Sequence, residues 1–445
     1  MHLTAVTFGS RGDVEPYATL SRSLAAAGHH VRLLTHGEYA PLVADTGVEF
    51  VATRGRSTRE LVESEEGRAV LRSARNPLTM LRRLAAILAP ELRVVYEDIL
   101  RSVRDADAVL AYPATFPALD VADQLGRPAV HVHHVPAMPT SAFPVAAPYM
   151  RARSLTGRGN RWSYTVDAWL LWQLVHAATD QARMAALGPG AGRYRLRRAL
   201  AQRRRRVGAV VGVSRHVLPP PPDWPDDTAV CGYWWPADGG DDTPALGEST
   251  LRFLDAGPAP LFVGLGSTPV PDPASVTGQL AAAARRAQVR LILQRGWAGL
   301  GEGLEDPQIH VVGDVSYQAL FPRVAGVVHH GGAGTTALGL RCGRPTMCLP
   351  AVADQFFWGH RVTAVGAGPP PLSISRLRSD RLAPRLAALT AHRYAGRAAE
   401  IAAALADEDG PAAAVAAVER FLARAPRAAG RVGSRHAHAE RGRER

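Results

Sequence analysis

The sequence predicts an α/β protein made of two successive Rossmann-like domains that face a central cleft. Three observations support this prediction. Short, fully apolar segments alternate with helical patterns along the chain, as in parallel sheets covered by helices on both faces. A stretch rich in Gly, Pro, Asp and Ser interrupts the alternation at residues 236–250, and the alternation then starts again. The length of 445 residues suits two or three domains of ordinary size.

The N-terminal domain, residues 1–235, is expected to open with a strand–helix–strand unit. Leu3–Phe8 is predicted as a short apolar strand. Apolar residues then recur at helical spacing from Pro16 until Gly28, which is expected to end the helix. The later strands of this domain are predicted at residues 31–35, 108–111, 129–133, 207–213 and 228–232.

The C-terminal domain, residues 251–423, repeats the alternation. A helix at residues 411–424 is expected to close the fold, and residues 424–445 are expected to form a disordered, arginine-rich tail. In two such domains a ligand is expected between the carboxyl ends of the two sheets. The strands of this domain are predicted at residues 260–264, 289–294, 309–312, 326–330 and 345–349.

The charge of the chain excludes several classes of function. It has 52 basic residues against 40 acidic ones, a formal charge of +12, and every basic residue is arginine. Without lysine there can be no Walker A site, no protein-kinase lysine, no Schiff-base aldolase and no pyridoxal phosphate enzyme. Residues 193–206 carry eight arginines and no acid, and the tail carries +5, which leaves −1 for everything else. We therefore expect a solvated basic surface and a basic tail rather than a nucleic-acid partner, and only weak membrane-surface association stays open.

The compartment is predicted from what the sequence lacks. Cys231, Cys342 and Cys348 form no Cys-x-x-Cys pair, so neither a disulfide framework nor a zinc site is indicated. Met1 leads directly into a strand, which leaves no room for a signal peptide, and no run of about 18 apolar residues appears. We expect a cytoplasmic protein, and the sequence does not decide between a monomer and a dimer.

The strongest chemical signal is a glycine-rich turn between a strand and a helix. The strand is expected to end at His330, and Gly332 and Gly334 allow a ligand to approach the main chain closely. Amides at the start of the following helix favour negative charge, and the hydroxyls of Thr335 and Thr336 add donors. This pattern predicts a cradle for a diphosphate that uses no lysine.

A dinucleotide-binding oxidoreductase is an alternative for the same residues. Gly332-x-Gly334-x-x-Ala337 matches the G-x-G-x-x-G/A pattern, and Asp354 follows Gly332 by 22 residues. The acid of such a site normally ends the second strand, whereas Asp354 is expected in a loop. The pattern also lies in the second domain rather than the first, which makes this the weaker hypothesis.

Several motifs in the right order resemble inverting, nucleotide-sugar-dependent glycosyltransferases of the GT-B fold. The donor-binding signature is HHGGAGTT, followed by the GRP–LP spacing and by ADQ with aromatic residues. DQFFWGHRV is similar to the sterol and natural-product branch, including glycopeptide and macrolide-type enzymes. TFGSRGDVEP at the N-terminus, VCGYWWP, VGLGST and VGDVSYQALFPR occur in corresponding places. The resemblance covers residues 1 to about 420.

The resemblance implies that Asp13 is the catalytic base. A neutral acceptor hydroxyl must lose its proton as it attacks the anomeric carbon, and a carboxylate with a raised pKa in a partly dry cleft suits that step. The alternative is that Asp13 only caps the following helix, and the two roles are compatible. Plant relatives orient a catalytic His with a downstream Asp. Here Asp120 and Asp123 are candidates for such a relay, and the sequence assigns neither.

The resemblance also assigns the donor site. His330 and the glycine-rich turn would stabilise the departing diphosphate, with help from Ser10 and Arg11 of the other domain. Trp297 would stack on the nucleotide base, although a core tryptophan is nearly as good an interpretation. The donor-binding residues implied are Ser10, Ser267, Trp297, His330, Gly332, Gly334, Thr335, Asp354 and Gln355.

The acceptor side is less clear from the sequence. His133, His134 and Phe143 lie in a region that helps to line the acceptor pocket in the family. A metal site is a poor interpretation of the three His in HVHH, because no further ligand cluster accompanies them. Residues 162–175 contain three Trp, for which packed core is the default and a pocket wall or membrane-facing patch the alternative.

Together these features predict an inverting glycosyltransferase. It would move a hexose or deoxyhexose from a UDP- or dTDP-sugar to a hydroxyl of a lipophilic natural product or sterol-like acceptor, as in antibiotic biosynthesis. We expect no cofactor and no metal in catalysis. The remaining alternative from another class is a non-catalytic GT-B protein that assists a partner transferase.

Overall fold

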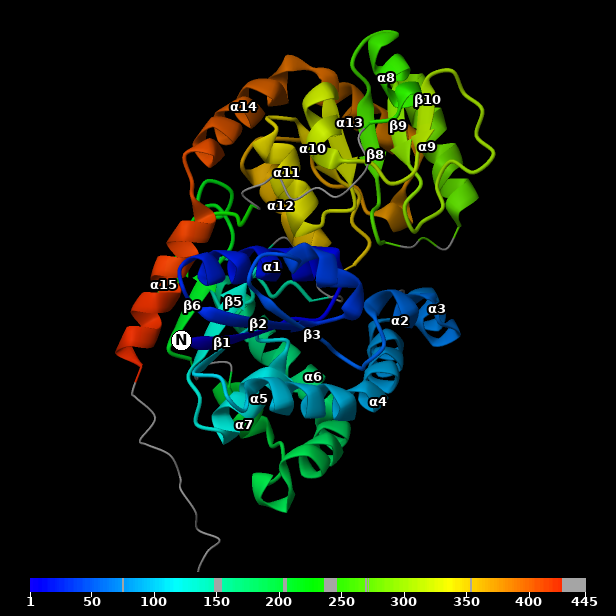
Figure 1. Ribbon diagram of the computed structural model, residues 1–445. Coiled ribbons are helices and arrows are strands. Elements are labelled where there is room, and N and C mark those ends of the chain that lie inside the picture. Colours follow the sequence, from blue (N-terminus) through cyan, green and yellow to red (C-terminus); the bar gives the residue numbers. More distant parts are fainter. Residues whose placement is uncertain are drawn as a thin grey trace, which may run out of the picture.

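The computed structural model describes residues 1–73, 76–147, 154–202, 206–235, 246–268, 270, 272–352 and 354–425. It contains two α/β domains, the N-terminal domain below and the C-terminal domain above in Figure 1. Most of the predicted linker, residues 236–245, and most of the predicted tail, residues 426–445, lie outside the described residues. The end of the predicted linker is helical, because α8 (Glu248–Asp255) begins there.

The N-terminal domain contains a parallel sheet that has seven strands within the described residues, in the order β3-β2-β1-β4-β5-β6-β7. The sequence pattern does not predict β3, because this four-residue edge strand is only half-buried and has no fully apolar run. The strands are β1 (His2–Val6), β2 (His30–Thr35), β3 (Glu49–Ala52), β4 (Ala108–Ala111), β5 (Ala129–His133), β6 (Gly208–Val211) and β7 (Thr228–Val230).

The C-terminal domain repeats the design with a parallel sheet of five strands among the described residues, in the order β10-β9-β8-β11-β12. Every predicted strand of both domains is present, with ends that differ by at most two residues from the prediction. The fold class predicted from the alternating pattern is therefore confirmed. The strands are β8 (Leu261–Gly264), β9 (Leu291–Gln294), β10 (Ile309–Val312), β11 (Gly326–His329) and β12 (Thr346–Cys348).

Helices cover both faces of each sheet, because alternate side chains of every strand must be buried on opposite faces. In β4, Ala108 and Leu110 face one apolar core and Val109 and Ala111 face another. Around the N-terminal sheet lie α1 (Arg11–Ala26), η1 (Gly37–Val43), α2 (Thr58–Glu63), α3 (Glu65–Arg72), α4 (Pro77–Val103), α5 (Phe116–Gln124), α6 (Gly157–Leu187), η2 (Pro189–Ala191) and α7 (Leu196–Gln202).

The C-terminal sheet is covered in the same way. In β8, Leu261 and Val263 face the core beneath α9 and α13, whereas Phe262 faces the core beneath α8 and α10. Besides α8, the elements of this half are α9 (Pro273–Ala287), α10 (Tyr317–Leu320), η3 (Phe321–Arg323), α11 (Ala333–Arg341), α12 (Gln355–Ala364), η4 (Ile374–Arg376), α13 (Ser379–Thr390) and α14 (His392–Ala406).

The closing helix, α15 (Gly410–Arg424), packs on the N-terminal domain rather than on the C-terminal one (Figure 1). Phe421 and Val418 belong to the same apolar core as Leu3 of β1. Gly208 of β6 makes room for this helix, since a Cβ atom there would lie 2.2 Å from the ring of Phe421. The last helix of the predicted C-terminal domain, residues 251–423, therefore packs on the other domain, because the apolar face of α15 matches a surface distant in sequence.

A shared apolar core also joins the two domains. Val211 of β6 and Phe143 pack in one cluster with Leu340 of α11, Trp358 of α12 and Leu405 of α14. Arg361 of α12 strengthens this junction by donating two hydrogen bonds, of 3.0 and 2.7 Å, to the carbonyl of Val217. One side of the interdomain boundary is therefore packed like a protein interior.

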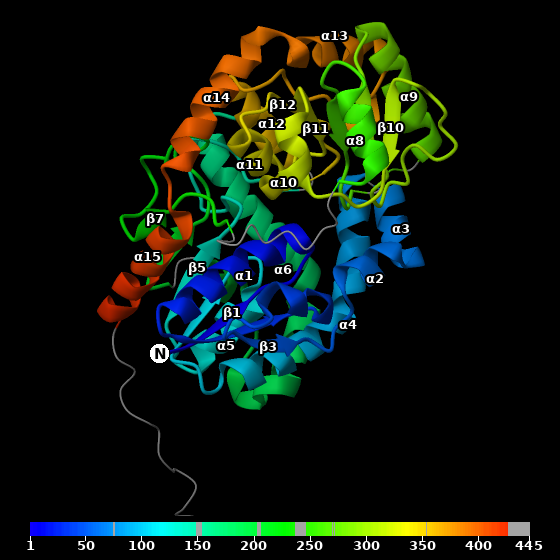
Figure 2. The same cartoon turned by 45° about the horizontal axis from the view of Figure 1, so that its top comes forward.

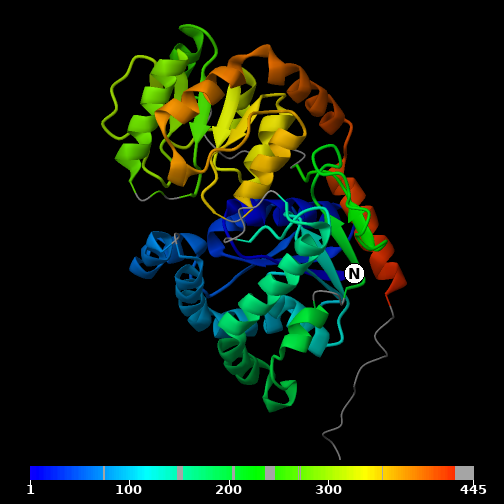
Figure 3. The same cartoon turned by 180° about the vertical axis from the view of Figure 1, so that it is seen from behind.

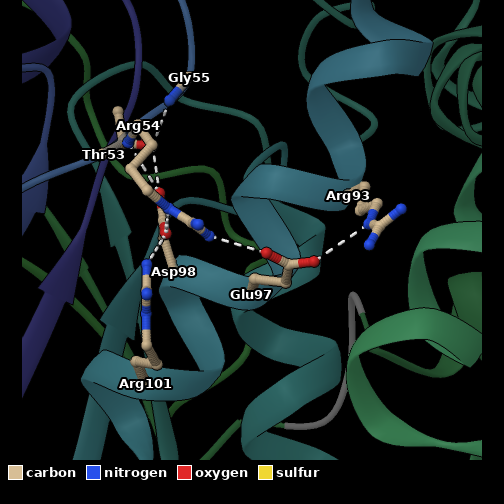
Figure 4. A network of polar contacts seen from close by, with 7 residues as sticks. All are labelled: Thr53, Arg54, Gly55, Arg93, Glu97, Asp98 and Arg101. Atoms are coloured by element: carbon tan, nitrogen blue, oxygen red, sulfur yellow. Dashed lines mark hydrogen bonds and ion pairs between the residues drawn. The ribbon is translucent and has the colours of Figure 1, made fainter.

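A buried carboxylate ties the segment after β3 to α4 (Figure 4). The side chain of Asp98 is 2% exposed, and it accepts hydrogen bonds from Thr53 Oγ1 (3.0 Å) and from Arg54 N and Nε (both 2.8 Å). Arg101 completes the set, and Glu97 holds the far end of the Arg54 guanidinium at 2.8 Å. Burial raises the pKa of Asp98, but these hydrogen bonds outweigh burial and lower it. The network fixes the segment that leads into α2.

The three tryptophans of residues 162–175 all lie on α6, where Trp172 is half-buried and the other two are exposed. Trp172 donates a hydrogen bond from Nε1 to the carbonyl of Tyr194 at 2.9 Å. Trp162 and Trp169 are 68% and 44% exposed, so packed core is wrong for these two. Among the described residues, none of the helices combines the length and apolar character that crossing a bilayer requires. The cytoplasmic location stays a prediction.

Phe421→Ala is expected to destabilise the N-terminal domain. It opens a cavity between α15 and β6, which should lower the free energy of unfolding by about 3–5 kcal/mol. Glu419→Ala is the matched control on the same helix, since this half-exposed carboxylate contacts His29 at the surface. Differential scanning calorimetry measures both variants. Equal melting temperatures for the two would show that α15 does not anchor this domain.

Candidate functional site

The order of the strands places two crevices opposite each other. In the N-terminal sheet the crossover direction reverses between β1 and β4, and in the C-terminal sheet it reverses between β8 and β11. Loops that leave the carboxyl ends of strands at such a switch point diverge, and ligands of open α/β sheets bind there. The sequence motifs after β1, β8 and β11 therefore lie at the edges where a ligand is expected.

Asp13 lies in the first turn of α1, directly after the loop that leaves β1. Its Oδ2 accepts hydrogen bonds from Ser10 N (2.8 Å) and Ser10 Oγ (2.9 Å), and its Oδ1 lies 3.1 Å from His134 Nε2. Gly9 makes this arrangement possible. A Cβ atom on Gly9 would lie 2.3 Å from Oδ2, and its φ of +145° favours glycine.

The predicted capping role of Asp13 is confirmed, and its role as catalytic base stays a prediction. Ser10 precedes α1 and forms a reciprocal capping box with Asp13, so the carboxylate stabilises the start of the helix. The side chain is still 39% exposed, toward the cleft. The amide and the hydroxyl of Ser10 both donate hydrogen bonds to Asp13. Arg11 is a half-exposed surface charge that pairs with Glu15 at 3.5 Å.

The electrostatics of Asp13 differ from the expectation. Burial raises its pKa, but the hydrogen bond and the charge of His134, together with the bonds from Ser10, outweigh burial. The pKa of Asp13 therefore lies below its ordinary value, and the predicted raised pKa is wrong. The carboxylate is ionised at neutral pH.

His134 is the partner of Asp13 that the sequence did not assign. It follows β5, is 8% exposed and packs its ring 5.0 Å from Tyr112 and 6.0 Å from Tyr17. The candidates Asp120 and Asp123 lie elsewhere, where Asp120 is fully buried against Arg183.

The contact joins residues 121 positions apart, which no local pattern reveals. The signal that was available is topological, since both residues follow the carboxyl ends of strands in one sheet.

The other histidines of HVHH belong to the core. His131 and His133 are both fully buried, with ring centroids 6.0 Å apart, and their ring nitrogens have no partner among the described residues. Burial, with help from Arg206, lowers the pKa of His131 to about 3, and burial lowers the pKa of His133 well below its usual value. His133 therefore does not line an acceptor pocket, because its side chain is fully buried in the core.

Phe143 does line a cavity. The cavity has a volume of about 310 Å³ and lies between residues 142–146 of the N-terminal domain and α12 of the C-terminal domain. The ring of Phe143 lies 4.9 Å from that of Phe357, and Phe356 and Leu218 also contribute to the walls. The walls are largely apolar, and the cavity lies beside α12, the helix that follows Asp354.

On the opposite sheet, His330 sits tightly between two glycines. A Cβ atom on Gly266 would lie 3.1 Å from the His330 ring, and one on Gly332 would lie 2.5 Å from its Nε2. Burial lowers the pKa of His330 to about 4, so the ring is neutral at pH 7. Its Nδ1 has no hydrogen-bond partner among the described residues. His330 can therefore act as a neutral hydrogen-bond donor or acceptor.

The glycine-rich turn opens at the N-terminus of α11. Gly332 is the N-cap of this helix, and a Cβ atom on Gly334 would meet no atom within 4 Å. Thr335 lies half-buried in the first turn. Thr336 does not add a free hydroxyl, since it is buried and donates to the carbonyl of Gly332 at 2.8 Å. The first amides of α11, which have no helical partner, are the natural anion donors here.

Asp354 and Gln355 have different surroundings although they are adjacent. Asp354 Oδ2 accepts a hydrogen bond from Trp358 Nε1 at 2.9 Å. Gln355 is buried, and its Oε1 accepts from the amides of Ala351 (2.8 Å) and Val352 (3.1 Å). Its Nε2 donates to Thr268 Oγ1 at 3.1 Å. Gln355 thus ties the turn before α12 to the loop after β8.

Ser267 and Trp297 complete the set on this edge. Ser267 is half-buried in the turn that follows β8. The amide of Trp297, which follows β9, donates to the carbonyl of Gly266 at 3.1 Å. The indole is 38% exposed, and the guanidinium of Arg59 from α2 lies 5.6 Å from its centroid. Figure 2 shows α2 and α3 beneath the C-terminal domain, consistent with this contact across the cleft.

Asp13 of the N-terminal domain and Asp354 of the C-terminal domain are close enough to influence each other. Burial and, to a smaller extent, the negative charge of Asp13 raise the pKa of Asp354 to about 6, against opposing effects of Trp358 and His134. The carboxyl edges of the two sheets therefore face each other across a common cleft. In the part of the chain that the structure describes, no three His, Cys, Asp or Glu side chains gather as a metal site would require.

Two sequence-family models match the chain. The glycosyltransferase family 28 N-terminal domain matches residues 3–144. The C-terminal domain of erythromycin biosynthesis protein CIII-like proteins matches residues 302–421. The first match contains Asp13 and His134, and the second contains the glycine-rich turn and Asp354.

Curated relatives cover nearly the whole chain. Sterol 3-beta-glucosyltransferase UGT80B1 of Arabidopsis thaliana is 31% identical over 428 residues, which are 95% of this chain and 68% of the relative. A sterol 3-beta-glucosyltransferase of Emericella nidulans is 30% identical over 433 residues, and there the chain spans only 30% of the relative.

Solved structures share the fold. The glycotransferase of kitacinnamycin superposes with a TM-score of 0.66 at 19% identity, covering 95% of this chain and 99% of the other. The glycosyltransferase VinC, solved in complex with dTDP, superposes with a TM-score of 0.61 at 18% identity over 96% and 100%. The chain therefore belongs to the family of nucleotide-sugar-dependent GT-B glycosyltransferases that includes the plant sterol 3-beta-glucosyltransferases, as its motifs predicted.

Proposed function

We propose that the protein transfers a hexose or deoxyhexose, with inversion, from a UDP- or dTDP-sugar to a hydroxyl group of a lipophilic acceptor. The observation that supports this most strongly is the carboxylate of Asp13, which Ser10 and His134 orient toward a cleft lined by Asp354. The names of the relatives and the dTDP complex of VinC point to the same substrate classes. A sterol-like or antibiotic-type natural product is the proposed acceptor.

The alternatives fit the geometry less well. A helper protein without catalysis would not need a carboxylate held by three hydrogen bonds at the cleft. An oxidoreductase would need its ribose-binding acid at the end of a strand, whereas β12 ends at Cys348 and Asp354 instead occupies the N-cap position of α12.

In the proposed reaction Asp13 accepts the proton of the acceptor hydroxyl. The acceptor oxygen forms a bond to the anomeric carbon while the bond from that carbon to the diphosphate oxygen breaks. The hydroxyl becomes strongly acidic as its new bond forms, so a carboxylate of lowered basicity can accept the proton late in the step. His134 and Ser10 hold the carboxylate in place for that transfer.

The departing diphosphate carries away the electron pair. We propose that the first amides of α11, the hydroxyl of Thr335 and the neutral ring of His330 stabilise this charge. Gly334 leaves open space for the phosphates to approach, and Gly332 makes room for the His330 ring. Ser267 lies on the same edge, and Trp297 presents a ring face to the base. The proposal uses these donors alone, with neither a metal ion nor a cofactor.

The sugar and the acceptor are proposed to occupy different parts of the cleft. We propose that Asp354 accepts hydrogen bonds from sugar hydroxyls through its ionised form, and that Gln355 positions the surrounding turn. The apolar body of the acceptor is proposed to occupy the cavity beside Phe143. The cavity is lined in part by α12, and Asp354 directly precedes this helix, so the proposed acceptor and sugar positions lie along the same helix.

Asp13→Asn is expected to abolish transfer while leaving nucleotide binding intact. The amide keeps the size and some hydrogen bonds of the carboxylate but cannot accept the proton, so kcat should fall by about 10²–10⁴-fold. Turnover is measured on the isolated chain with UDP- and dTDP-sugars. Thermal-shift titrations with UDP, dTDP and GDP should give the same shifts as for the wild type. A wild-type rate would remove Asp13 from its proposed role.

His134→Asn is expected to lower kcat and to move the acid limb of the pH–rate profile upward. Without the imidazole, burial of Asp13 is less opposed, so the pKa of its carboxyl should rise. Asp123→Asn is the matched control, since Asp123 pairs with Arg198 away from the cleft and should change the profile little. An unshifted acid limb in His134→Asn would contradict the positioning role.

Asp354→Asn tests the second carboxylate through the pH dependence of stability. The folded-state pKa of about 6 lies above the ordinary 3.8, so the fold favours the protonated form. The wild type should therefore lose stability relative to the variant as the pH rises from about 4 to 6, by up to about 3 kcal/mol. The amide can still accept the bond from Trp358.

Melting temperatures of Asp354→Asn and the wild type are compared from pH 4 to 8. A constant difference would mean that Asp354 is not a raised-pKa carboxyl. If Asp354 accepts sugar hydroxyls as an anion, the KM of the wild type for the donor should also rise as the pH falls below about 6.

A further inference from the structure

An apolar patch lies on the surface of the N-terminal domain, on helices α6 and α7. Trp162, Val166 and Trp169 of α6 are 68%, 44% and 44% exposed, and their spacing puts them on one face of the helix. With Leu196 and Leu200 of α7 they line a groove of about 250 Å³. We call these five residues the α6–α7 patch. Figure 3 shows α6 along the near face of this domain.

The patch is not the result of a poorly packed helix. The opposite face of α6 is well buried, and Asn160, Ser163 and Tyr164 from that face make hydrogen bonds to residues of the N-terminal domain. Two neighbouring exposed indoles are unusual in a protein whose surface meets only water, and clustered apolar surface of this kind marks an interaction site.

The exposed charges on the stretch of chain that carries the patch have a single sign, and Arg161 of this stretch also pairs with Asp223 of a later segment at 3.3 Å. Among the described residues 154–202, the acidic side chains are Asp167, which is buried, and Asp180, which is half-buried and accepts a bond from the amide of Tyr194. No exposed carboxylate therefore lies in this stretch of described residues. The exposed arginines of the stretch are Arg158, Arg161, Arg193, Arg195 and Arg197.

We propose that the α6–α7 patch docks the protein on an anionic lipid bilayer. Tryptophan is the side chain that partitions best into the headgroup region, with an apolar ring and a polar N–H. Arginines beside the ring set are attracted to anionic headgroups, and apolar insertion combined with that attraction is the general mode of interfacial binding. The exposed arginines of the basic segment 193–206 that the structure describes, Arg193, Arg195 and Arg197, thus acquire a role.

A second copy of the chain fits the patch less well than a bilayer. A two-fold interface would bring the same surface of both copies together. The exposed arginines of one copy would then face those of the other, without exposed carboxylates from this stretch to pair with them. Like charges opposed in an interface are unfavourable, whereas an anionic membrane complements them.

The same helix connects the patch to the cavity beside Phe143. Ser163 Oγ accepts a hydrogen bond from the amide of Val145 at 2.9 Å, and Tyr164 Oη donates to the carbonyl of Phe143 at 3.3 Å. The turn of α6 that presents Trp162 to the outside therefore holds the wall of the cavity on its inside. If the proposed lipophilic acceptor is correct, docking would bring the cavity to the phase in which that acceptor dissolves.

Vesicle cosedimentation of the full chain tests the proposal. The wild type should bind vesicles of phosphatidylcholine mixed with phosphatidylglycerol at least tenfold more strongly than vesicles of phosphatidylcholine alone. Trp162→Ser with Trp169→Ser should weaken binding to the mixed vesicles by about tenfold or more. Tryptophan fluorescence should shift to the blue with mixed vesicles, and this shift should be lost in the double variant.

Charge reversal provides the matched control. Arg193→Glu with Arg197→Glu should weaken binding to mixed vesicles by about fivefold per arginine or more. Arg252→Glu with Arg378→Glu makes the same change in net charge at exposed positions of the C-terminal domain and should change binding by less than about twofold. Equal losses in the two pairs would mean that net charge, not the patch, attracts the chain.

Three further measurements test whether the patch binds a membrane. Failure of the wild type to bind mixed vesicles, or unchanged binding in the tryptophan variant, overturns the proposal. Self-association in sedimentation velocity that the tryptophan variant abolishes would assign the patch to a second copy instead. Melting temperatures within a few degrees of the wild type show that the variants fold. Binding is measured without donor or acceptor, so its failure leaves the proposed transfer reaction standing.

Discussion

The function of this protein depends on the common direction of its strands. Within the described residues all strand pairs are parallel, so in each sheet every strand delivers its following loop to the same edge. At the two switch points these loops diverge and leave room for a ligand. Asp13 follows β1 and the glycine-rich turn follows β11, so the two chemical groups lie on facing edges of the two domains.

The two carboxylates in the cleft have pKa values shifted in opposite directions. Asp13 receives hydrogen bonds from Ser10 and His134, which lower its pKa although it is close to another acid. Asp354 receives one bond from Trp358, and burial together with Asp13 raises its pKa to about 6. The environment therefore keeps one group ionised and makes the other sensitive to mild acid, as in enzymes that assign different tasks to paired carboxyls.

Apolar packing outside the cleft holds the two domains together. The apolar core shared by β6, α11, α12 and α14 joins them on one side, and α15 returns to cover the N-terminal sheet. On another side the guanidinium of Arg59 lies 5.6 Å from the ring centroid of Trp297, which is a weak interaction at an exposed site. The buried network around Asp98 holds the segment that carries Arg59.

The sequence by itself determined the fold class, nearly all strands and the motifs of the cleft. These features are local, because a buried strand, a helix end and a glycine-rich turn each depend on a few consecutive residues. The half-exposed β3 escaped prediction for the same reason, since it lacks a local apolar signal.

Only the tertiary structure decided which side chains meet. His134 reaches Asp13 across 121 residues, His133 turns into the core, and α15 crosses to the first domain. It also left Trp162 and Trp169 on the surface, where composition favours the core. The physical reason is that burial, hydrogen-bond partners and pKa follow from neighbours in space, and those neighbours exist only once the two sheets are packed together.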